Sequence, residues 1–311
     1  MDLFSNKLSP ASQPGGRPRA AVELAPGGAL AAALPGKGLP PVFAYAALPH
    51  GALTPGIAEL NLHQSAVVTE ALRTALDSVS PADRAVTLVI PDTATRVFML
   101  DFDSLPAKLA EALPVLRFRM RKMVPFDVEH AAVTYQVLEQ HSPADKASGQ
   151  LKVLATLMPF AILAEYEAAV RAADYEPGAV LPSSLAALAA LDSPDPILAA
   201  NLSGVGLTTA ITHGQDLLLY RTVELPADRA ERIAEIQRSV AVAAAYFEDK
   251  LSAPPRQIHY AGAMDAREFA RYIGDAQLSV VEVAPAPVTD ATTTLGPIGF
   301  AGVMGALAGV A

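Results

Sequence analysis

The sequence predicts a two-lobed α/β protein, and three observations support this prediction. Its 311 residues suffice for about two domains of ordinary size. The two halves repeat one pattern, in which strand, glycine turn and strand are followed by a further strand and a long helix. A proline-rich linker candidate, Ser193-Pro194-Asp195-Pro196, separates them. Duplicated lobes of this kind suggest a nucleotide cleft between two related domains.

The first half begins with a tail rich in Ser, Pro and Gly, residues 1–18, which we expect to be disordered. The apolar stretch Ala20–Ala33 predicts two strands, because Pro26-Gly27-Gly28 interrupts it with a tight turn. A strand, a helix and two β-rich runs, joined as a hairpin or a corner, follow at Val42–Leu48, Pro55–Val79, Ala85–Ile90 and Arg96–Phe102. We therefore expect a first lobe over 19–104.

The middle of the chain, 105–192, interleaves helical and strand patterns, which predicts an inserted α+β subdomain. A polar loop separates its first two strands, and Pro125 follows its first helix. Its expected elements are a helix at Leu105–Lys122, strands at His130–Leu138 and Leu151–Met158, a helix at Pro159–Ala173, a strand at Pro177–Val180 and a helix at Ser183–Leu191.

The second half predicts a second lobe over 193–295. Three strands form a meander, and then the longest helix carries a single apolar stripe. The expected order is strands at Ile197–Leu202, Leu207–Thr212 and Leu217–Leu225, a helix at Ala227–Leu251, a strand at Gln257–Ala261, a helix at Ala266–Ile273 and a strand at Leu278–Val283. The remaining residues, 296–311, predict a terminal helix that packs back on the first lobe.

Charge and composition exclude several classes of protein. The chain has 23 Lys and Arg against 32 Asp and Glu, a net charge of −9, which argues against nucleic-acid binding. It has no cysteine, which excludes disulfides, cysteine-ligated zinc, iron–sulfur clusters and thiol nucleophiles. The apolar fraction of 51% is ample for a core, so wholesale disorder is excluded.

The mean hydropathy of +0.30 raises the question of a membrane segment. The N-terminus has no apolar run typical of a signal peptide. The apolar run at Gly296–Ala311 has 16 residues, fewer than the ~17 that a spanning helix needs, and lacks flanking basic or aromatic residues. We interpret it as a buried helix of small residues, although the spacing of Gly305 and Gly309 also suits packing in a membrane.

One long segment resembles a known family. Leu116–Leu138 reads LRFRMRKMVPFDVEHAAVTYQVL, a helix that runs into a VPF turn and then a strand with Y-x-V. This resembles type IV pilus assembly proteins of the PilM family. Val86–Pro106 is similar to the hairpin before that segment, and Leu163–Leu191 to the helix, strand and helix after it. The resemblance covers nearly the whole chain from about residue 19.

The PilM resemblance implies an actin-like (ribonuclease H-like) two-lobed fold with an inserted α+β subdomain. It implies a cytoplasmic protein, peripheral to the inner membrane, that binds a short N-terminal peptide of a membrane-anchored partner. Pilus motor components are further partners that it suggests. Related cytoplasmic domains, of the L type, occur in type II secretion.

The same resemblance locates a nucleotide site, with ATP and Mg²⁺ as its expected cofactors. Its matching positions are Glu23, Gly27, Gly28, Asn201, Ser203, Gly204, Thr208 and Gly262. Glu23 and Asn201 stand where the family has Asp, Pro26 removes an N–H donor and Leu30 replaces a Lys. These changes predict a degenerate cleft with lost or feeble hydrolysis. ATP binding stays open, as does the simpler interpretation that the glycines only form turns.

Two surfaces are candidates for partners. The resemblance suggests a peptide groove between the first lobe and the insert near Met123, Val124, Pro125 and Phe126, although Val124 and Phe126 are equally interpreted as core residues. The basic cluster contains Arg117, Arg119, Arg121 and Lys122. Either it is a solvated helix face with ion pairs, or it contacts acidic lipid headgroups or an acidic partner.

The sequence thus favours an adaptor or scaffold of a type IV pilus assembly platform. The alternatives are an active ATP-binding ATPase or kinase of the same superfamily and a type II secretion component. No catalytic residue or metal ligand is predicted, because the six histidines are scattered and Ser183-Ser184 lacks a G-x-S-x-G context. Asp92, Asp101 and Asp103 are conceivable carboxylate ligands, but Asp at a strand end more often forms turns.

Overall fold

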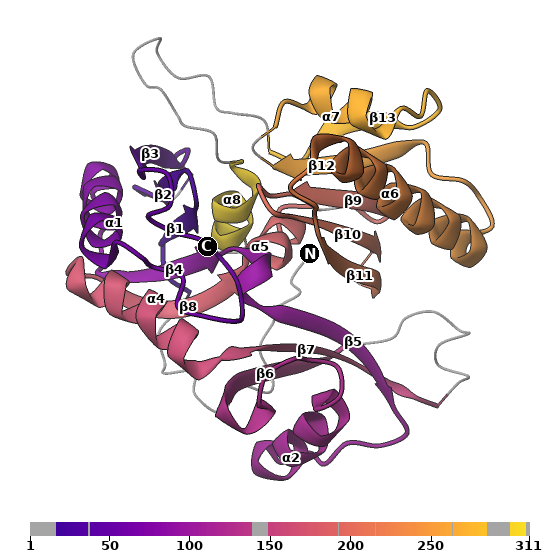
Figure 1. The fold of residues 1–311 in the computed structure, drawn as a ribbon, viewed down its shortest axis with the longest axis horizontal. Coiled ribbons are helices and arrows are strands. Elements are labelled where there is room, and N and C mark those ends of the chain that lie inside the picture. The colour runs from indigo at the N-terminus through magenta and orange to yellow at the C-terminus, as the bar shows by residue number, and fades with distance from the viewer. Residues whose placement is uncertain are drawn as a thin grey trace.

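The computed structural model describes residues 17–36, 38–138, 149–191, 193–214, 216–262, 264–284 and 299–308. The tail predicted at 1–18 lies outside this range apart from its last two residues. Two five-stranded sheets and one three-stranded sheet form the protein (Figure 1). None of the helices in the described ranges has the length and apolar composition needed to cross a membrane.

The first sheet has the order β3-β2-β1-β4-β8. Its first three strands are antiparallel, and β4 and β8 run parallel to β1. The bounds are β1 Ala20–Ala25, β2 Gly28–Ala33, β3 Val42–Ala47, β4 Ala85–Ile90 and β8 Glu176–Pro182. The turn predicted at Pro26-Gly27 connects β1 and β2, with Ala25 opposite Gly28. Helices α1 (Ser65–Val79) and α4 (Phe160–Ala172) pack on one face.

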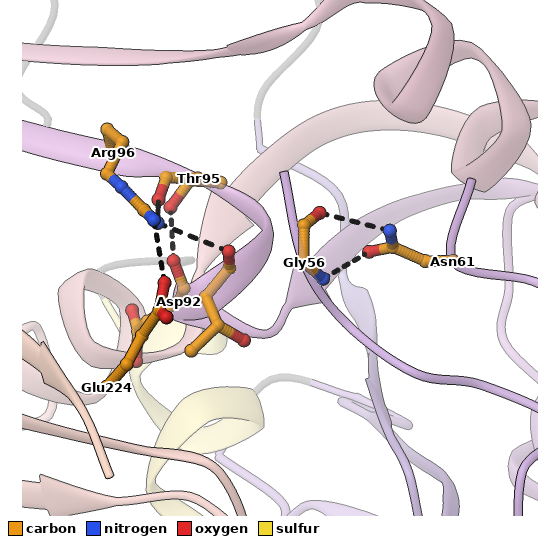
Figure 2. Close-up of polar contacts among 7 residues, drawn as sticks. Gly56, Asn61, Asp92, Thr95, Arg96 and Glu224 are labelled. Carbon is orange, nitrogen blue, oxygen red and sulfur yellow. Dashed lines mark hydrogen bonds and ion pairs between the residues drawn. The ribbon is translucent and has the colours of Figure 1, made fainter. Parts of the chain in front are cut away.

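Helix α1 begins at Ser65, ten residues after the predicted start, because the preceding segment is a loop organised by buried Asn61. The Asn61 amide accepts a hydrogen bond from Gly56 N and donates one to Gly56 O, as Figure 2 shows. Tyr166 of α4 donates to the same amide oxygen. Side-chain bonds of this kind compete with helical backbone bonds, so the chain does not enter the helix earlier.

The second sheet repeats the first, with the order β11-β10-β9-β12-β13 and the same strand directions. Its strands are β9 Pro196–Leu202, β10 Gly206–His213, β11 Asp216–Glu224, β12 Gln257–Gly262 and β13 Ser279–Glu282. Helices α6 (Arg229–Leu251) and α7 (Ala266–Ile273) cover its outer face. Each begins at an aspartate that caps it. Two sheets of this order confirm the predicted actin-like two-lobed fold.

A three-stranded sheet of order β5-β7-β6 follows β4. Its strands are β5 Arg96–Phe102, β6 Ala131–Leu138 and β7 Leu151–Pro159, and α2 (Leu109–Met120) packs on it. Its extent differs from the insert expected at 105–192. It begins nearer the N-terminus, because β5 turns away from the first sheet and pairs with β7. It ends earlier, because β8 returns to pair with β4 in the first sheet.

Two short helices lie between the large sheets, α5 (Ser183–Leu188) and α8 (Ala301–Leu307) (Figure 1). Leucines of α5 pack on the second sheet, whereas Val303, Ala306 and Leu307 of α8 pack on the first. The helices touch so closely that a Cβ at Gly305 would overlap the carbonyl oxygen of Ala186. The small residues of the C-terminal run therefore allow the two lobes to approach each other.

This crossing predicts that Gly305→Val destabilises the protein. The added side chain overlaps backbone that cannot move aside, so we expect the free energy of unfolding to fall by roughly 3 kcal/mol. Chemical denaturation measures the change. The control Gly56→Ala adds a Cβ that meets nothing within 4 Å and should leave the free energy unchanged. Equal stabilities of the Gly305→Val variant and the wild-type protein would contradict this packing.

Candidate functional site

Polar side chains from both lobes meet at the start of α5, between the two large sheets. Glu23 comes from β1, Asn201 from β9 and Asp92 from the short 3₁₀ turn after β4. Ser183 and Ser184 open α5. The family resemblance assigned Glu23 and Asn201 to one nucleotide site, and in the structure both side chains bond to Ser183.

Glu23 is buried against α8. Its Oε1 accepts a hydrogen bond of 2.6 Å from Ser183 Oγ, while its Oε2 has no hydrogen-bond partner among the described residues. A Cβ at Gly302 would overlap that oxygen, so α8 covers the carboxyl group. Burial raises the pKa of Glu23 from 4.5 to about 7; the bond from Ser183 opposes the rise and the charge of Asp92 adds to it.

Asp92 is the second buried carboxyl group of the site. Its oxygens accept three hydrogen bonds: from Ser184 N at 3.0 Å, from Ser184 Oγ at 2.6 Å and from Tyr220 OH at 3.3 Å. Burial raises the pKa of Asp92, and these bonds oppose the rise. The carboxylate thus caps the first turn of α5, a contact far from it in sequence. The sequence marked Asp92 only as a conceivable ligand or turn former, because nothing local predicts this contact.

Asn201 connects the second lobe to this cluster. Its Nδ2 donates to Ser183 Oγ at 3.2 Å and to Ser184 Oγ at 2.9 Å. Each serine hydroxyl therefore accepts from Asn201 and donates to one carboxyl group. We call the series Glu23–Ser183–Asn201–Ser184–Asp92 the interlobe hydrogen-bond chain. A neutral amide suits this position, since an aspartate here would add a third carboxyl group to the cluster and supply no donor when ionised.

The first predicted phosphate turn is closed by the neighbouring strand. The carbonyl oxygen of Gly27 accepts hydrogen bonds from Tyr45 OH at 2.6 Å and from Leu48 N at 3.0 Å. A Cβ at Gly28 would overlap Ala46 O, which explains glycine there by packing alone. Pro26 supplies no N–H. Close packing on β3 thus explains the glycine at position 28 of this turn.

The second turn also forms its hydrogen bonds within the protein. Ser203 N donates to Gly206 O at 2.9 Å, and Ser203 Oγ accepts from Gly206 N at 2.9 Å. Arg232 donates to the carbonyl oxygen of Gly204 at 3.0 Å. Buried Thr208 pairs with Thr222 at 2.8 Å between their hydroxyl oxygens. Two N–H donors of this turn, those of Ser203 and Gly206, are therefore engaged within it.

Gly262, the position predicted near an adenosine, has a φ of 145° at the end of β12. A Cβ there would overlap Leu202 O, and Gly299 packs directly on its backbone. A small pocket lies between α5 and the second sheet, lined mainly by Ala, Leu and Val with Ser184, Asn201, Thr208 and His259. Its cavity volume of about 10 Å³ is close to what one water molecule needs, so a nucleotide does not fit into it.

A second contact joins the lobes at the surface. Arg96 donates to the carbonyl oxygens of Thr93 and Thr95, and its other terminal nitrogen pairs with Glu224 of β11 at 2.7 Å (Figure 2). Thr95 Oγ1 donates to Asp92 O at 3.0 Å, which fixes the same turn. The turn that holds Asp92 is therefore attached to the second lobe by an ion pair.

The VPF turn lies beyond α2, on the three-stranded sheet. Val124 and Phe126 pack against the core of that sheet, which agrees with their interpretation as core residues. Met123 and Pro125 are exposed. This segment is separate from the interlobe hydrogen-bond chain, so the predicted partner and cofactor residues do not form one site.

The four predicted basic residues have two different environments. Arg117 is half-buried and donates to the carbonyl oxygens of Val128 and Ala131, so it attaches the following turn to α2. Arg119, Arg121 and Lys122 are exposed. The functional surface predicted from the sequence therefore contains three available cations.

Solved structures of other proteins have a similar fold. A chain of the PilM-PilN type IV pilus biogenesis complex superposes with a TM-score of 0.66 and 17% identity, over 94% of this chain and 100% of that chain. This chain shares that fold. Family models give no match, and curated proteins give none.

Two further solved structures are similar over most of their length. The cytoplasmic domain of EpsL, an inner membrane component of the type II secretion system of Vibrio cholerae, has a TM-score of 0.48 and 14% identity over 78% of this chain and 81% of that chain. A Bacteroides thetaiotaomicron protein of unknown function, with an actin-like ATPase fold, has a TM-score of 0.49 and 12% identity over 86% and 91%.

The buried Glu23 predicts a pH dependence of stability. A carboxyl group whose pKa is higher in the folded protein binds its proton more tightly there, so the free energy of unfolding rises as the pH falls from about 7 toward 4.5. Glu23→Gln removes this contribution. Above pH 7 the variant should be more stable than the wild-type protein by roughly 1–3 kcal/mol.

Denaturation at a series of pH values measures this difference. Glu248→Gln, on the exposed face of α6, is the matched control and should keep the wild-type pH dependence. Parallel profiles for the Glu23→Gln variant and the wild-type protein would show that Glu23 stays ionised in the folded state.

Proposed function

We propose that the chain is an adaptor or scaffold of a type IV pilus or related assembly platform at the inner membrane. The proposal rests on the structural similarity to a chain of the PilM-PilN complex, which extends over the whole length of the matched chain. Under this proposal the chain is cytoplasmic, peripheral to the membrane, and recruits a membrane-anchored partner of the PilN kind.

The interlobe hydrogen-bond chain favours a scaffold over an ATPase or kinase. A phosphoryl-transfer site needs carboxylates that hold Mg²⁺ and N–H groups that face the phosphates. Here Glu23 is covered by α8 and bonded to Ser183, and Asn201 is neutral. The turns at Gly27 and Ser203 form hydrogen bonds within the protein. We infer that the lobes are held together by protein groups in place of Mg·ATP.

The partner peptide, on this proposal, lies across the VPF turn in an extended conformation. Val124 and Phe126 would position the turn from the core, because they pack inward. Met123, which is 44% exposed, and Pro125 would contact the peptide. Backbone pairing and apolar contacts supply affinity in recognition of this kind.

A binding measurement tests this surface. The N-terminal peptide of a membrane-anchored protein encoded beside this chain, labelled with a fluorophore, should bind the full-length protein in an anisotropy titration. Met123→Asp should weaken binding at least about tenfold, because it puts a charge at an apolar contact. Val242→Asp, on the exposed face of α6, is the control and should bind normally. Equal affinities of the Met123→Asp variant and the wild-type protein would exclude this turn.

A further inference from the structure

Phe118 is the most exposed large hydrophobic residue in the described part of the chain, with 81% of its surface accessible. It lies on α2, which packs on the three-stranded sheet away from the two large sheets (Figure 1). Val115, one helical turn earlier, is also exposed at 37%. A side chain with this exposure has little contact with the rest of the protein, so its apolar surface is available to a partner.

Three cations follow Phe118 closely in the chain. Arg119 is on α2, Arg121 is its C-cap and Lys122 lies in the turn that follows. None of the three forms an ion pair with a described residue. Their positive charge is therefore available to a partner.

The acidic neighbours of this surface have contacts of their own. Glu111 pairs with Lys108 at 3.4 Å, and Asp127 contacts His130 at 2.9 Å and also interacts with Arg121. Glu129 lies 4.0 Å from Arg117, which the backbone already binds. A positive patch thus persists on a protein whose net charge is −9. An anionic surface would attract this patch and repel the remainder of the chain, which fixes an orientation.

We propose that the α2 surface, consisting of Val115, Phe118, Arg119, Arg121 and Lys122, docks on a bilayer that contains anionic lipids. Phe118 and Val115 enter the region between the headgroups and the acyl chains, and the cations contact the lipid phosphates. The docking is independent of the VPF turn and of any partner peptide. It would give the protein a direct contact with the membrane beside its contact with a membrane-anchored protein.

Co-sedimentation with vesicles tests the proposal. The full-length protein should sediment with phosphatidylcholine vesicles that contain phosphatidylglycerol, and not with vesicles of phosphatidylcholine alone. High salt should weaken the binding, because screening reduces the attraction. Failure to sediment with the anionic vesicles would overturn the proposal, as would equal binding to the neutral ones. Binding to immobilised polyglutamate without binding to vesicles would also overturn it and indicate an acidic protein partner.

Two variants distinguish the contribution of charge to vesicle affinity from that of apolar contact. Reversal of Arg119, Arg121 and Lys122 to Glu should reduce vesicle affinity by roughly a hundredfold or more, because each basic residue near an anionic surface contributes about a fivefold factor. Phe118→Ser keeps the charge and should reduce affinity by roughly tenfold. Unchanged sedimentation of either variant would contradict the proposed surface.

The matched control reverses three exposed arginines of the second lobe to Glu: Arg256, Arg267 and Arg271. It changes the net charge by the same amount and should keep wild-type binding to anionic vesicles. Loss of binding in this control would show a general charge effect and overturn the α2 assignment. Circular dichroism melting of each variant verifies that it is folded, and all substituted side chains are exposed.

Discussion

The interlobe hydrogen-bond chain is the interaction on which the rest of the structure depends. It connects β1, the turn after β4, the start of α5 and β9, so both lobes contribute to it. Burying Glu23 and Asp92 is costly, and the two serine hydroxyls and the Asn201 amide offset this cost by donating hydrogen bonds. Because α5 and α8 then pack through glycine and alanine, the two large sheets are held close together.

Because this hydrogen-bond chain fills the space between the lobes, the surfaces that we propose for function lie on the outside of the molecule. If protein groups occupy the centre of the cleft, the carboxyl groups there are already engaged and are not free to bind a nucleotide. No nucleotide then shifts the lobes between two arrangements. The three-stranded sheet then carries the working surfaces that we propose, with Met123 at the turn after α2 and Phe118 on α2 itself. A rigid pair of lobes is a suitable support for such an exposed module.

Local patterns predicted much of this fold. The turn at Pro26-Gly27 and the apolar stripe of α6 were predicted from local patterns. The family resemblance assigned Glu23 and Asn201 to one nucleotide site, and in the structure both contact Ser183. The partners that connect them were missed, because the serines that open α5 meet the carboxyl groups only through tertiary packing. The extent of the three-stranded sheet differed from the predicted insert for the same reason, since β5 and β8 pair with strands that are distant in sequence. The helix predicted over Pro55–Val79 is shorter in the structure, because the loop around Asn61 occupies its first part.

Calorimetric titration of the full-length protein with Mg·ATP tests whether the interlobe hydrogen-bond chain takes the place of a nucleotide. If the interlobe hydrogen-bond chain replaces the nucleotide, the titration should show no saturable heat up to millimolar ATP, with or without Mg²⁺. Saturable binding with micromolar affinity would contradict the account, because it would require Glu23, Ser183 and Asn201 to release one another and open the cleft.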